Sequence, residues 1–437
     1  MNTLFQTTNL RTFLLCGQQL GEHENGLNES TCDAIFLHFK FLCVLDLHGT
    51  GIKTVPSSII KLNHVRYLDL SDNKLIEMLP QSLSRFQNLQ TLKLSRCVRL
   101  KELPRYISKL VNLRILEIDG YRDLIHMPYG LRQLTNLRTL SQFVISKDTR
   151  SVSRNNGELK ELNTLNNLRG TLEIVNLRHG KDAEAESNAT NLRGMEHLRG
   201  LKLRWIEDKV DKADVVFDET SLEALQPHPN LKLLSLYRYM EVGFPNWLSS
   251  LTNLVEFTLF GCKKCQHLPL LYQFPSLKVL ELDSLSALEY ISHGEEFSNS
   301  SFLSSLEELK IKYCPNLKGW KQRGDSIDDD NSTGIATTTT TTAGNHIPPS
   351  FSRLSKLCIR ACPQLVSMPL FPFLENLELY YCSFKPLEQT TRIAAAEATV
   401  VASASSSTRA TSSFAPLSKL KSMEIGRMEE PLPEEFM

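Results

Sequence analysis

A triplet of apolar residues with the spacing L-x-x-L-x-L recurs along the chain at an almost constant interval. In the most regular stretch, successive triplets begin at Leu42, Val65, Leu89, Leu113 and Leu137, which are 23, 24, 24 and 24 residues apart. This interval falls within the length of about 20–29 residues that is typical of leucine-rich repeats. The sequence therefore predicts a repetitive fold rather than a domain built around one central core.

A second signature follows each of these triplets. Pro56 precedes apolar residues three, six and nine positions later, and Pro80, Pro104 and Pro128 do the same. The last two residues of a triplet share one face of a strand, since they are two positions apart. Proline cannot donate a ladder hydrogen bond, so it ends the strand. The spacing of three then predicts a short helical or 3-10 return with one apolar side chain per turn.

These two signatures predict how the repeats assemble. A single repeat cannot bury its own apolar face, so neighbouring repeats must stack. We expect an α/β solenoid: a leucine-rich-repeat horseshoe with a concave parallel β-sheet and short helical, 3-10 or irregular convex returns.

The repeat interval is regular in some parts of the 437-residue chain and fails in others. We expect an irregular lead-in with one degenerate repeat at 1–41, repeats at 42–323 that are irregular at 144–197, further repeats at 346–389, and a final truncated repeat at 414–437. Two segments, 324–345 and 390–413, have low-complexity compositions, such as the six consecutive threonines from Thr337 to Thr342. They cannot bury much apolar surface, and we predict that both are disordered insertions.

Composition excludes several classes of function. Lys+Arg and Asp+Glu both number 49, and a net charge of zero argues against a dedicated nucleic-acid or anionic-membrane binder. No stretch approaches the ~18 apolar residues that a membrane span requires, and the amino-terminal segment is a poor signal peptide. Ten cysteines without a secretory signal indicate reduced thiols. We therefore expect a cytoplasmic or nuclear protein without a membrane span.

The sequence offers little for catalysis or metal binding. It contains no G-x-S-x-G, no G-x-G-x-x-G, no phosphate-binding G-x-x-x-x-G-K-[ST] and no H-x-x-x-H. Cys262 and Cys265 form a C-x-x-C, but no second pair lies nearby and no redox fold surrounds it. We predict a chain that is not an enzyme, has no cofactor, and uses these cysteines structurally.

The third residue after each triplet has a recurring chemical character. Thr50 and Asn73 hold this place in early repeats, and cysteines hold it later, at Cys97, Cys262, Cys314, Cys362 and Cys382. A small polar side chain at the turn that ends a strand can bond the backbone of a neighbouring repeat. We predict this structural role.

The residues two, four and six positions after each triplet start point away from the core, and we call them the outward strand face. The candidate partner-binding residues on this face are Asp46, His48, Asp69, Lys93, Glu117, Asp119, Lys202, Arg204, Tyr237, Phe260, Lys310, Lys312, Lys356, Arg360 and Tyr380. They change from mostly acidic early in the chain to mostly basic late. Two interpretations remain open: a strand face that is polar because it is wet, or a partner surface, which exposed aromatics beside charges favour.

Residues 157–248 carry a more specific pattern than the leucines. The segments GELKELNTLNNLRGTLEIVNL, NLRGMEHLRGLKLRW and LEALQPHPNLKLLSLYRY, with the later Cys314-Pro315-Asn316-Leu317 and Cys362-Pro363-Gln364-Leu365, closely resemble the repeat domain of plant coiled-coil-class nucleotide-binding leucine-rich-repeat (NLR) immune receptors. The resemblance implies a protein-recognition module in plant defence. It would sense pathogen effectors or modified host proteins and restrain an NLR switch domain. Its partner would be a pathogen effector, a host guardee or the NLR nucleotide-binding domain, with no nucleic acid.

The sequence lacks the nucleotide-binding part of such receptors, including the P-loop, so we expect a receptor fragment or a truncated homologue. Two other classes of protein share leucine-rich repeats. An intracellular leucine-rich-repeat scaffold of small-GTPase signalling would have strict repeats throughout, and the irregular block at 144–230 opposes it. A ubiquitin-ligase adaptor needs an F-box ahead of the repeats, and the first 41 residues are too short for one.

Overall fold

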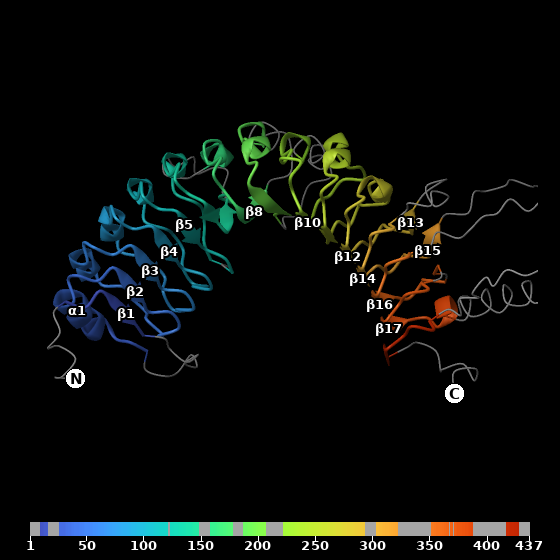
Figure 1. Cartoon of the computed structure of the whole chain (residues 1–437), viewed down its shortest axis with the longest axis horizontal. Coiled ribbons are helices and arrows are strands. Elements are labelled where there is room, and N and C mark those ends of the chain that lie inside the picture. The colour runs from blue at the N-terminus through green and yellow to red at the C-terminus, as the bar shows by residue number, and fades with distance from the viewer. Residues whose placement is uncertain are drawn as a thin grey trace, which may run out of the picture. The chain divides into compact units, whose positions relative to one another are not determined.

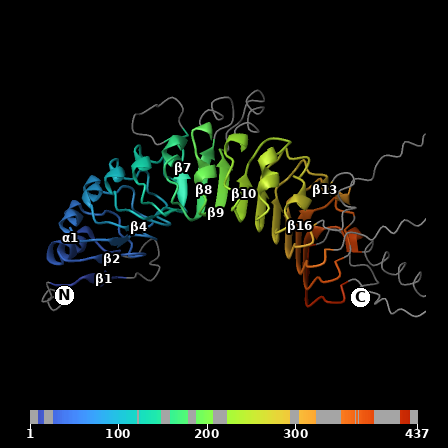
Figure 2. The ribbon, with the colours of Figure 1, turned by 45° about the horizontal axis from the view of Figure 1, so that its top comes forward.

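The computed structural model describes residues 9–15, 26–120, 123–147, 158–177, 187–206, 222–292, 303–321, 351–366, 368–369, 371–387 and 417–427. These residues fall into two compact units that divide between Tyr237 and Arg238. Within each unit, strands lie side by side along one flank, and short 3-10 turns follow the opposite flank (Figures 1 and 2). This is the arrangement of a leucine-rich-repeat solenoid, as the triplet spacing predicts.

The first unit begins with a parallel sheet of six strands in chain order. The strands are β1 (Thr12–Leu14), β2 (Val44–Asp46), β3 (Tyr67–Asp69), β4 (Thr91–Lys93), β5 (Ile115–Glu117) and β6 (Thr139–Leu140). Leu45, Leu68, Leu92 and Leu116 are successive register partners, and none of the four exposes any surface. The middle residue of every regular triplet therefore contributes to one continuous core.

The returns of this unit include the α-helix α1 (Glu29–His38) and a series of short 3-10 helices. The 3-10 helices are η2 (Ser57–Lys61), η3 (Gln81–Arg85), η4 (Ile107–Lys109), η5 (Leu131–Gln133), η6 (Leu159–Leu162) and η7 (Leu192–Gly194). Pro56 and Pro80 are the N-cap residues of η2 and η3, and Ile59 and Leu83 are buried. The proline signature thus marks the start of η2 and η3, whereas η4 and η5 begin after Tyr106 and Gly130, each two residues beyond the proline.

The irregular stretch of the sequence coincides with a break in this sheet. The chain leaves β6 and after Ser141 enters β7 (Gln142–Val144), which begins a second parallel set with β8 (Gly170–Leu177), β9 (Leu198–Trp205) and β10 (Leu233–Tyr237). The Ser141 side chain accepts a hydrogen bond from the Ile118 amide at 2.7 Å. The β8–β9 register also shifts twice. The triplet period fails here because the strands are longer and offset.

The second unit continues the repeats with six parallel strands. They are β11 (Glu256–Phe260), β12 (Val279–Asp283), β14 (Glu308–Lys312), β16 (Lys356–Cys362), β17 (Asn376–Cys382) and β18 (Ser422–Gly426). Its 3-10 helices are η9 (Asn246–Ser250), capped by Pro245, and η10 (Leu271–Gln273). A separate parallel pair, β13 (Tyr290–Ser292) and β15 (Gly319–Lys321), adds a small sheet that the sequence did not predict.

Polar side chains at some of the turns connect neighbouring repeats, which confirms the predicted role for Asn73, Cys97 and Cys382. The Asn73 amide donates to the Leu47 carbonyl of the preceding repeat at 2.9 Å and to Leu70 of its own at 2.8 Å. The Cys97 thiol likewise reaches Leu70 at 3.2 Å, and Cys382 reaches Ile359 at 3.6 Å.

At the same position in three later repeats the thiol bonds its own strand. Cys262, Cys314 and Cys362 donate to the carbonyl oxygens of Phe260 at 3.7 Å, Lys312 at 3.3 Å and Arg360 at 3.5 Å.

The low-complexity segments 324–345 and 390–413 lie outside the described residues. In the part of the chain that is described, no helix is long and apolar enough to cross a membrane.

Candidate functional site

The outward strand face is created by the alternation of side chains along each strand. In β14, Leu309 and Ile311 are buried, whereas Glu308, Lys310 and Lys312 are partly exposed. All fifteen predicted residues lie on a strand or just beyond its end, as the offsets require. One differs in exposure: Asp69 is buried, with 8 % of its surface accessible.

Two aspartates in the first unit are engaged by local hydrogen bonds. The Asp46 carboxylate accepts from the backbone amide of His48 at 3.0 Å and lies 2.9 Å from its Nδ1. This hydrogen bond, reinforced by the charges of Asp46 and Asp69, raises the pKa of His48 above its ordinary value. Asp69 accepts from the Ser71 amide at 2.9 Å and from the Tyr67 hydroxyl at 3.1 Å. Asp69 therefore stabilises the local structure and is not part of the exposed strand face.

The rest of the early face is less acidic than its sequence indicates. Lys93 pairs with Glu117 of the next strand at 3.1 Å, and Asp119 accepts a hydrogen bond from Ser95. Glu117 is partly exposed and Asp119 is exposed. These two carboxylates are the accessible acids on β5 and the turn after it.

An arginine–tyrosine stack lies on β9 and β10. The Arg204 guanidinium is 3.9 Å from the centroid of the Tyr237 ring, and the two residues are register partners. The Glu173 carboxylate of β8 holds the guanidinium from the other side, at 3.1 Å from Nε and 3.0 Å from Nη2. Lys202, on the same strand, has no acidic partner among the described residues.

The basic residues of the second unit also pair with carboxylates. Glu308 lies 2.9 Å from Lys310, Glu281 lies 2.7 Å from Lys312, and Glu378 lies 2.7 Å from Arg360. The prediction of a mostly basic late face is therefore wrong, because it omitted these glutamates. The signal was present: all three occupy positions two or four after a triplet start.

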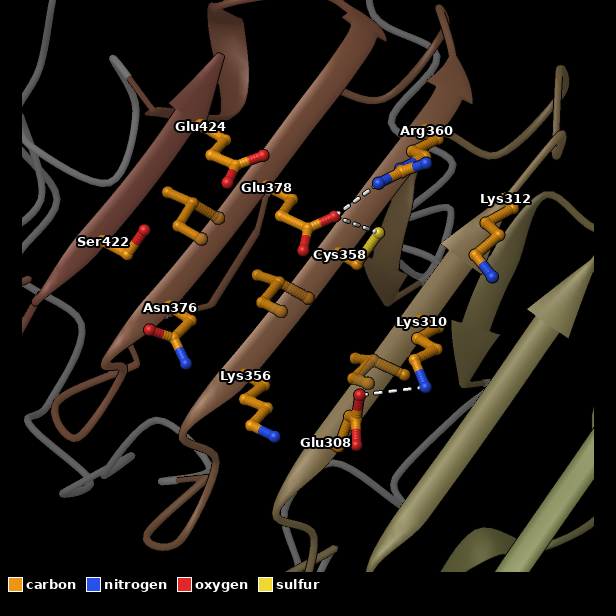
Figure 3. Close-up of a pocket in the computed structure, with 13 residues that line it drawn as sticks. Glu308, Lys310, Lys312, Lys356, Cys358, Arg360, Asn376, Glu378, Ser422 and Glu424 are labelled. Atoms are coloured by element: carbon orange, nitrogen blue, oxygen red, sulfur yellow. Dashed lines mark hydrogen bonds and ion pairs between the residues drawn. The ribbon is translucent and has the colours of Figure 1, made fainter.

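A groove of about 500 Å³ lies on the outward face of β14, β16, β17 and β18 (Figure 3). Charged and polar side chains from all four strands line it. The lining side chains that carry charge or polarity are Glu308, Lys310, Lys312, Lys356, Cys358, Arg360, Asn376, Glu378, Ser422 and Glu424. Four of the predicted residues meet here, and Phe260 and Tyr380 are not among the lining residues.

Cys358 sits within this groove, next to Glu378. Its thiol lies 3.3 Å from the Glu378 carboxylate, which also accepts from Arg360 at 2.7 Å. Burial, followed by the hydrogen bond and charge of Glu378, raises the pKa of the Cys358 thiol to about 11. The thiol therefore stays protonated at neutral pH and is a poor nucleophile.

The C-x-x-C cysteines occupy a different environment. Cys262 and Cys265 are both buried, and neither forms a disulfide bond. Burial raises the pKa of Cys262 to about 12 and also raises that of Cys265. Across the described residues, no group of three or more His, Cys, Asp or Glu side chains is placed to hold a metal ion. The structure thus gives these thiols a packing role.

Family comparisons identify the irregular block. A family model for R13L1/DRL21 leucine-rich repeats matches residues 159–285, and a general leucine-rich-repeat model matches residues 42–98. The first match covers the segments in which the sequence departs from simple repeats.

Three curated relatives are plant proteins with disease resistance names. Putative disease resistance protein RGA1 of Solanum bulbocastanum is 45% identical over 64% of this chain and 27% of its own length. Putative disease resistance protein RGA4 of the same species is 33% identical over 64% of this chain and 24% of its own length. Putative disease resistance RPP13-like protein 1 of Arabidopsis thaliana is 32% identical over 53% of this chain and 22% of its own length. The chain spans about a quarter of the length of these relatives.

Among solved structures, the chain is similar to TLR13 in its complex with ssRNA13, with a TM-score of 0.42 and 16% identity over 86% of this chain and 55% of that one. The repeat families and the resistance-protein relatives agree with the pattern at residues 157–248. A leucine-rich-repeat region of this kind is a non-catalytic module. The chain is a leucine-rich-repeat protein whose repeats are similar to those of plant disease resistance proteins.

Proposed function

We propose that this chain recognises proteins in plant defence: it senses a pathogen effector or a modified host protein and restrains an NLR switch domain. The outward strand face is the recognition surface, and the protein acts in the cytoplasm. The names of the curated relatives support a role in disease resistance.

One observation carries the choice of surface, namely that the same arginine–tyrosine stack occurs in both units. Arg204 lies over Tyr237 at 3.9 Å, and Arg360 lies over Tyr380 at 4.9 Å. In each pair the tyrosine is the register partner of the arginine on the next strand. A glutamate from an adjacent strand fixes each guanidinium, as described above.

Such stacks are well suited to binding proteins. Tyrosine and arginine are enriched among the residues that dominate binding energy at protein interfaces. Because both side chains are already held in place, little conformational entropy is lost when a partner binds. A merely wet strand face needs no such arrangement, so the stacks favour the partner-surface interpretation.

The alternative, a scaffold of small-GTPase signalling, is less well supported. The R13L1/DRL21 match falls on residues 159–285, a region that includes the irregular register of β8 and β9. Strict repeats throughout would have favoured the scaffold. No other observation in the described residues favours it.

The test is to graft the chain onto the switch domain of a related receptor and to score cell death in leaf tissue. Asp119→Lys with Glu117→Lys should loosen autoinhibition and produce cell death without an elicitor. Asp69 is left unchanged, because it is buried and its reversal would disturb folding. Lys310→Glu with Lys312→Glu and Arg360→Glu should alter recognition instead.

Matched controls reverse a charge outside the outward strand face. The controls are Glu77→Lys and Lys385→Glu. Glu77 lies between β3 and η3, Lys385 follows β17, and both residues are exposed. Each control should behave as the unmodified graft. If both face sets leave autoactivity and recognition unchanged while the proteins accumulate normally, the face is a solvated surface and the proposal fails.

A further inference from the structure

The groove on β14, β16, β17 and β18 is lined by both acidic and basic side chains. We infer that it binds an extended segment of a partner protein that crosses β16, β17 and β18 and carries one acidic and one basic side chain, three or four residues apart. The inference rests on the proposed function and specifies the chemistry of the partner at this site.

The strand register arranges the groove residues in rows. One row contains Glu308, Lys356, Asn376 and Ser422, which are successive register partners on β14, β16, β17 and β18. The next row, two residues further along the strands, contains Lys310, Cys358, Glu378 and Glu424. Figure 3 shows the two rows side by side on the sheet.

Most of the charged side chains that line the groove already pair with an opposite charge. Lys310 pairs with Glu308, Lys312 with Glu281, and Arg360 with Glu378. A partner that bound these groups would have to compete with an existing ion pair.

Two charges are left without an opposite charge among the described residues. Lys356 is exposed and forms no ion pair with any of them. Glu424 is exposed and accepts a hydrogen bond from the Tyr380 hydroxyl at 2.9 Å, with no described cation in ion-pair range. The groove therefore offers one available cation and one available anion.

The separation of these two groups sets the spacing of the partner's charges. Lys356 and Glu424 are two strands and two residues apart in register. With strands ~4.8 Å apart and a rise of ~3.4 Å per residue, their Cα atoms are about 12 Å apart. An extended chain covers that distance in about three or four residues.

The groove also supplies polar groups between the two charges. Asn376 and Ser422 lie in the row of Lys356, and both can donate and accept hydrogen bonds. An extended segment exposes its backbone amides and carbonyls to such groups. A compact anion such as phosphate fits less well, because a single available lysine faces three carboxylates in the lining.

Gly426 and Tyr380 hold the anionic end of the groove in place. A Cβ atom at position 426 would lie 2.6 Å from Cε1 of the Tyr380 ring. Glycine at this position therefore lets the ring lie against β18, where its hydroxyl reaches Glu424. The Tyr380 hydroxyl therefore helps to fix the position of the Glu424 carboxylate.

The test measures the binding of labelled peptides to the full chain by fluorescence polarisation. The probes are capped octapeptides in a serine and glutamine background with one Asp and one Lys at variable separation, together with matched Asp–Asp and Lys–Lys sets. The unmodified chain should prefer Asp–Lys peptides with a separation of three or four. The preference should be about two- to fivefold, since each contact is an exposed ion pair.

Single charge reversals should change the preference in opposite ways. Lys356→Glu presents two anions and should favour Lys–Lys peptides, whereas Glu424→Lys presents two cations and should favour Asp–Asp peptides. Lys356→Gln should lose the requirement for an acidic residue without gaining a new preference, and Lys385→Glu should bind as the unmodified chain does. Binding that ignores the separation, or a preference that both reversals leave unchanged, would overturn the inference.

The leaf assay separates this inference from the proposed function. If the peptides are not discriminated but the grafted charge reversals lose recognition, the groove inference fails and the proposed function stands. If the peptides are discriminated as expected but every graft behaves normally, the groove binds extended peptides and the proposed function fails.

Discussion

The Arg360 guanidinium donates to the Glu378 carboxylate at 2.7 Å, although the two residues belong to different repeats. The same carboxylate oxygen lies 3.3 Å from the Cys358 thiol. The hydrogen bonds from Arg360 and then Cys358 hold the pKa of Glu378 below its ordinary value. One carboxylate thus joins β16 to β17 and sets the chemistry of the groove.

This relationship leads to a prediction about thiol reactivity. Glu378→Gln should lower the pKa of Cys358 below its present value of about 11, because the hydrogen bond and negative charge of Glu378 both raise it. More thiolate will then be present at a given pH, so alkylation by iodoacetamide at mildly alkaline pH should become several-fold faster. Glu308→Gln is the matched control, since Glu308 pairs with Lys310. Equal rates in the two variants would show that burial alone controls this thiol.

The core register can be tested with one leucine. Leu92 is completely buried and is the register partner of Leu116. Leu92→Ala should cost about 2–5 kcal/mol of unfolding free energy, measured by denaturant titration. The same substitution at Leu37, whose surface is 50 % exposed in α1, should cost far less. Similar losses for both would contradict the core assignment.

A second stability prediction concerns the polar side chains at the turns. Asn73 is fully buried, donates to Leu47 and Leu70, and accepts from the Ile52 amide at 3.0 Å. Asn73→Ala leaves the Ile52 amide without a partner and removes one donor from Leu47 and Leu70, whose carbonyls keep Thr50 and Cys97 as donors, so it should cost about 1–3 kcal/mol.

Asn73→Cys should cost less, because Cys97 shows that a thiol at this position reaches the preceding repeat. Thermal and chemical unfolding of the two variants can be compared directly. If the cysteine variant is as unstable as the alanine variant, the thiol does not replace the amide.

The raised pKa of His48 gives a prediction about pH. Asp46→Asn should lower this pKa toward its ordinary value of about 6.5, because the hydrogen bond to Asp46 is the largest cause of the shift. A raised pKa in the folded state stabilises the fold fully below the unfolded value and is lost as pH rises through the folded value. Asp46→Asn should therefore destabilise the chain more in mild acid than at alkaline pH.

Nuclear magnetic resonance titration of the His48 ring protons measures the shift directly. Asp123→Asn, an exposed change outside the set of charges acting on His48, serves as the control. An unchanged His48 titration in Asp46→Asn would show that Asp46 does not hold the proton on the ring.

The sequence predicted the parts of the structure that depend on local spacing. The burial of Leu45, Leu68, Leu92 and Leu116 follows from a repeat whose length barely changes, because each repeat contacts its neighbours in the same way. The start of η2 at Pro56 follows from the fixed backbone geometry and missing amide of proline.

Other features depend on neighbours that a single repeat cannot reveal. The positional rule places Lys312 and Glu281 on the same face, but only the strand register brings them within 2.7 Å. Asp69 satisfies the rule for an outward position, yet it is buried and accepts hydrogen bonds from Tyr67 and Ser71. The pairing of β13 with β15 depends on equivalent turns in neighbouring repeats, and neither three-residue strand has an alternating pattern long enough to detect.

Carboxylate footprinting tests most directly the claim that the outward strand face contacts protein partners. The chain is labelled by carbodiimide-coupled amidation, alone and with the purified switch domain of a related receptor, and modification is measured by mass spectrometry. The account predicts that labelling of Glu117 and Asp119 falls when the switch domain is added, while labelling of Glu77, between β3 and η3, is unchanged. Protection of Glu77 instead, or no protection of Glu117 and Asp119, would contradict the account.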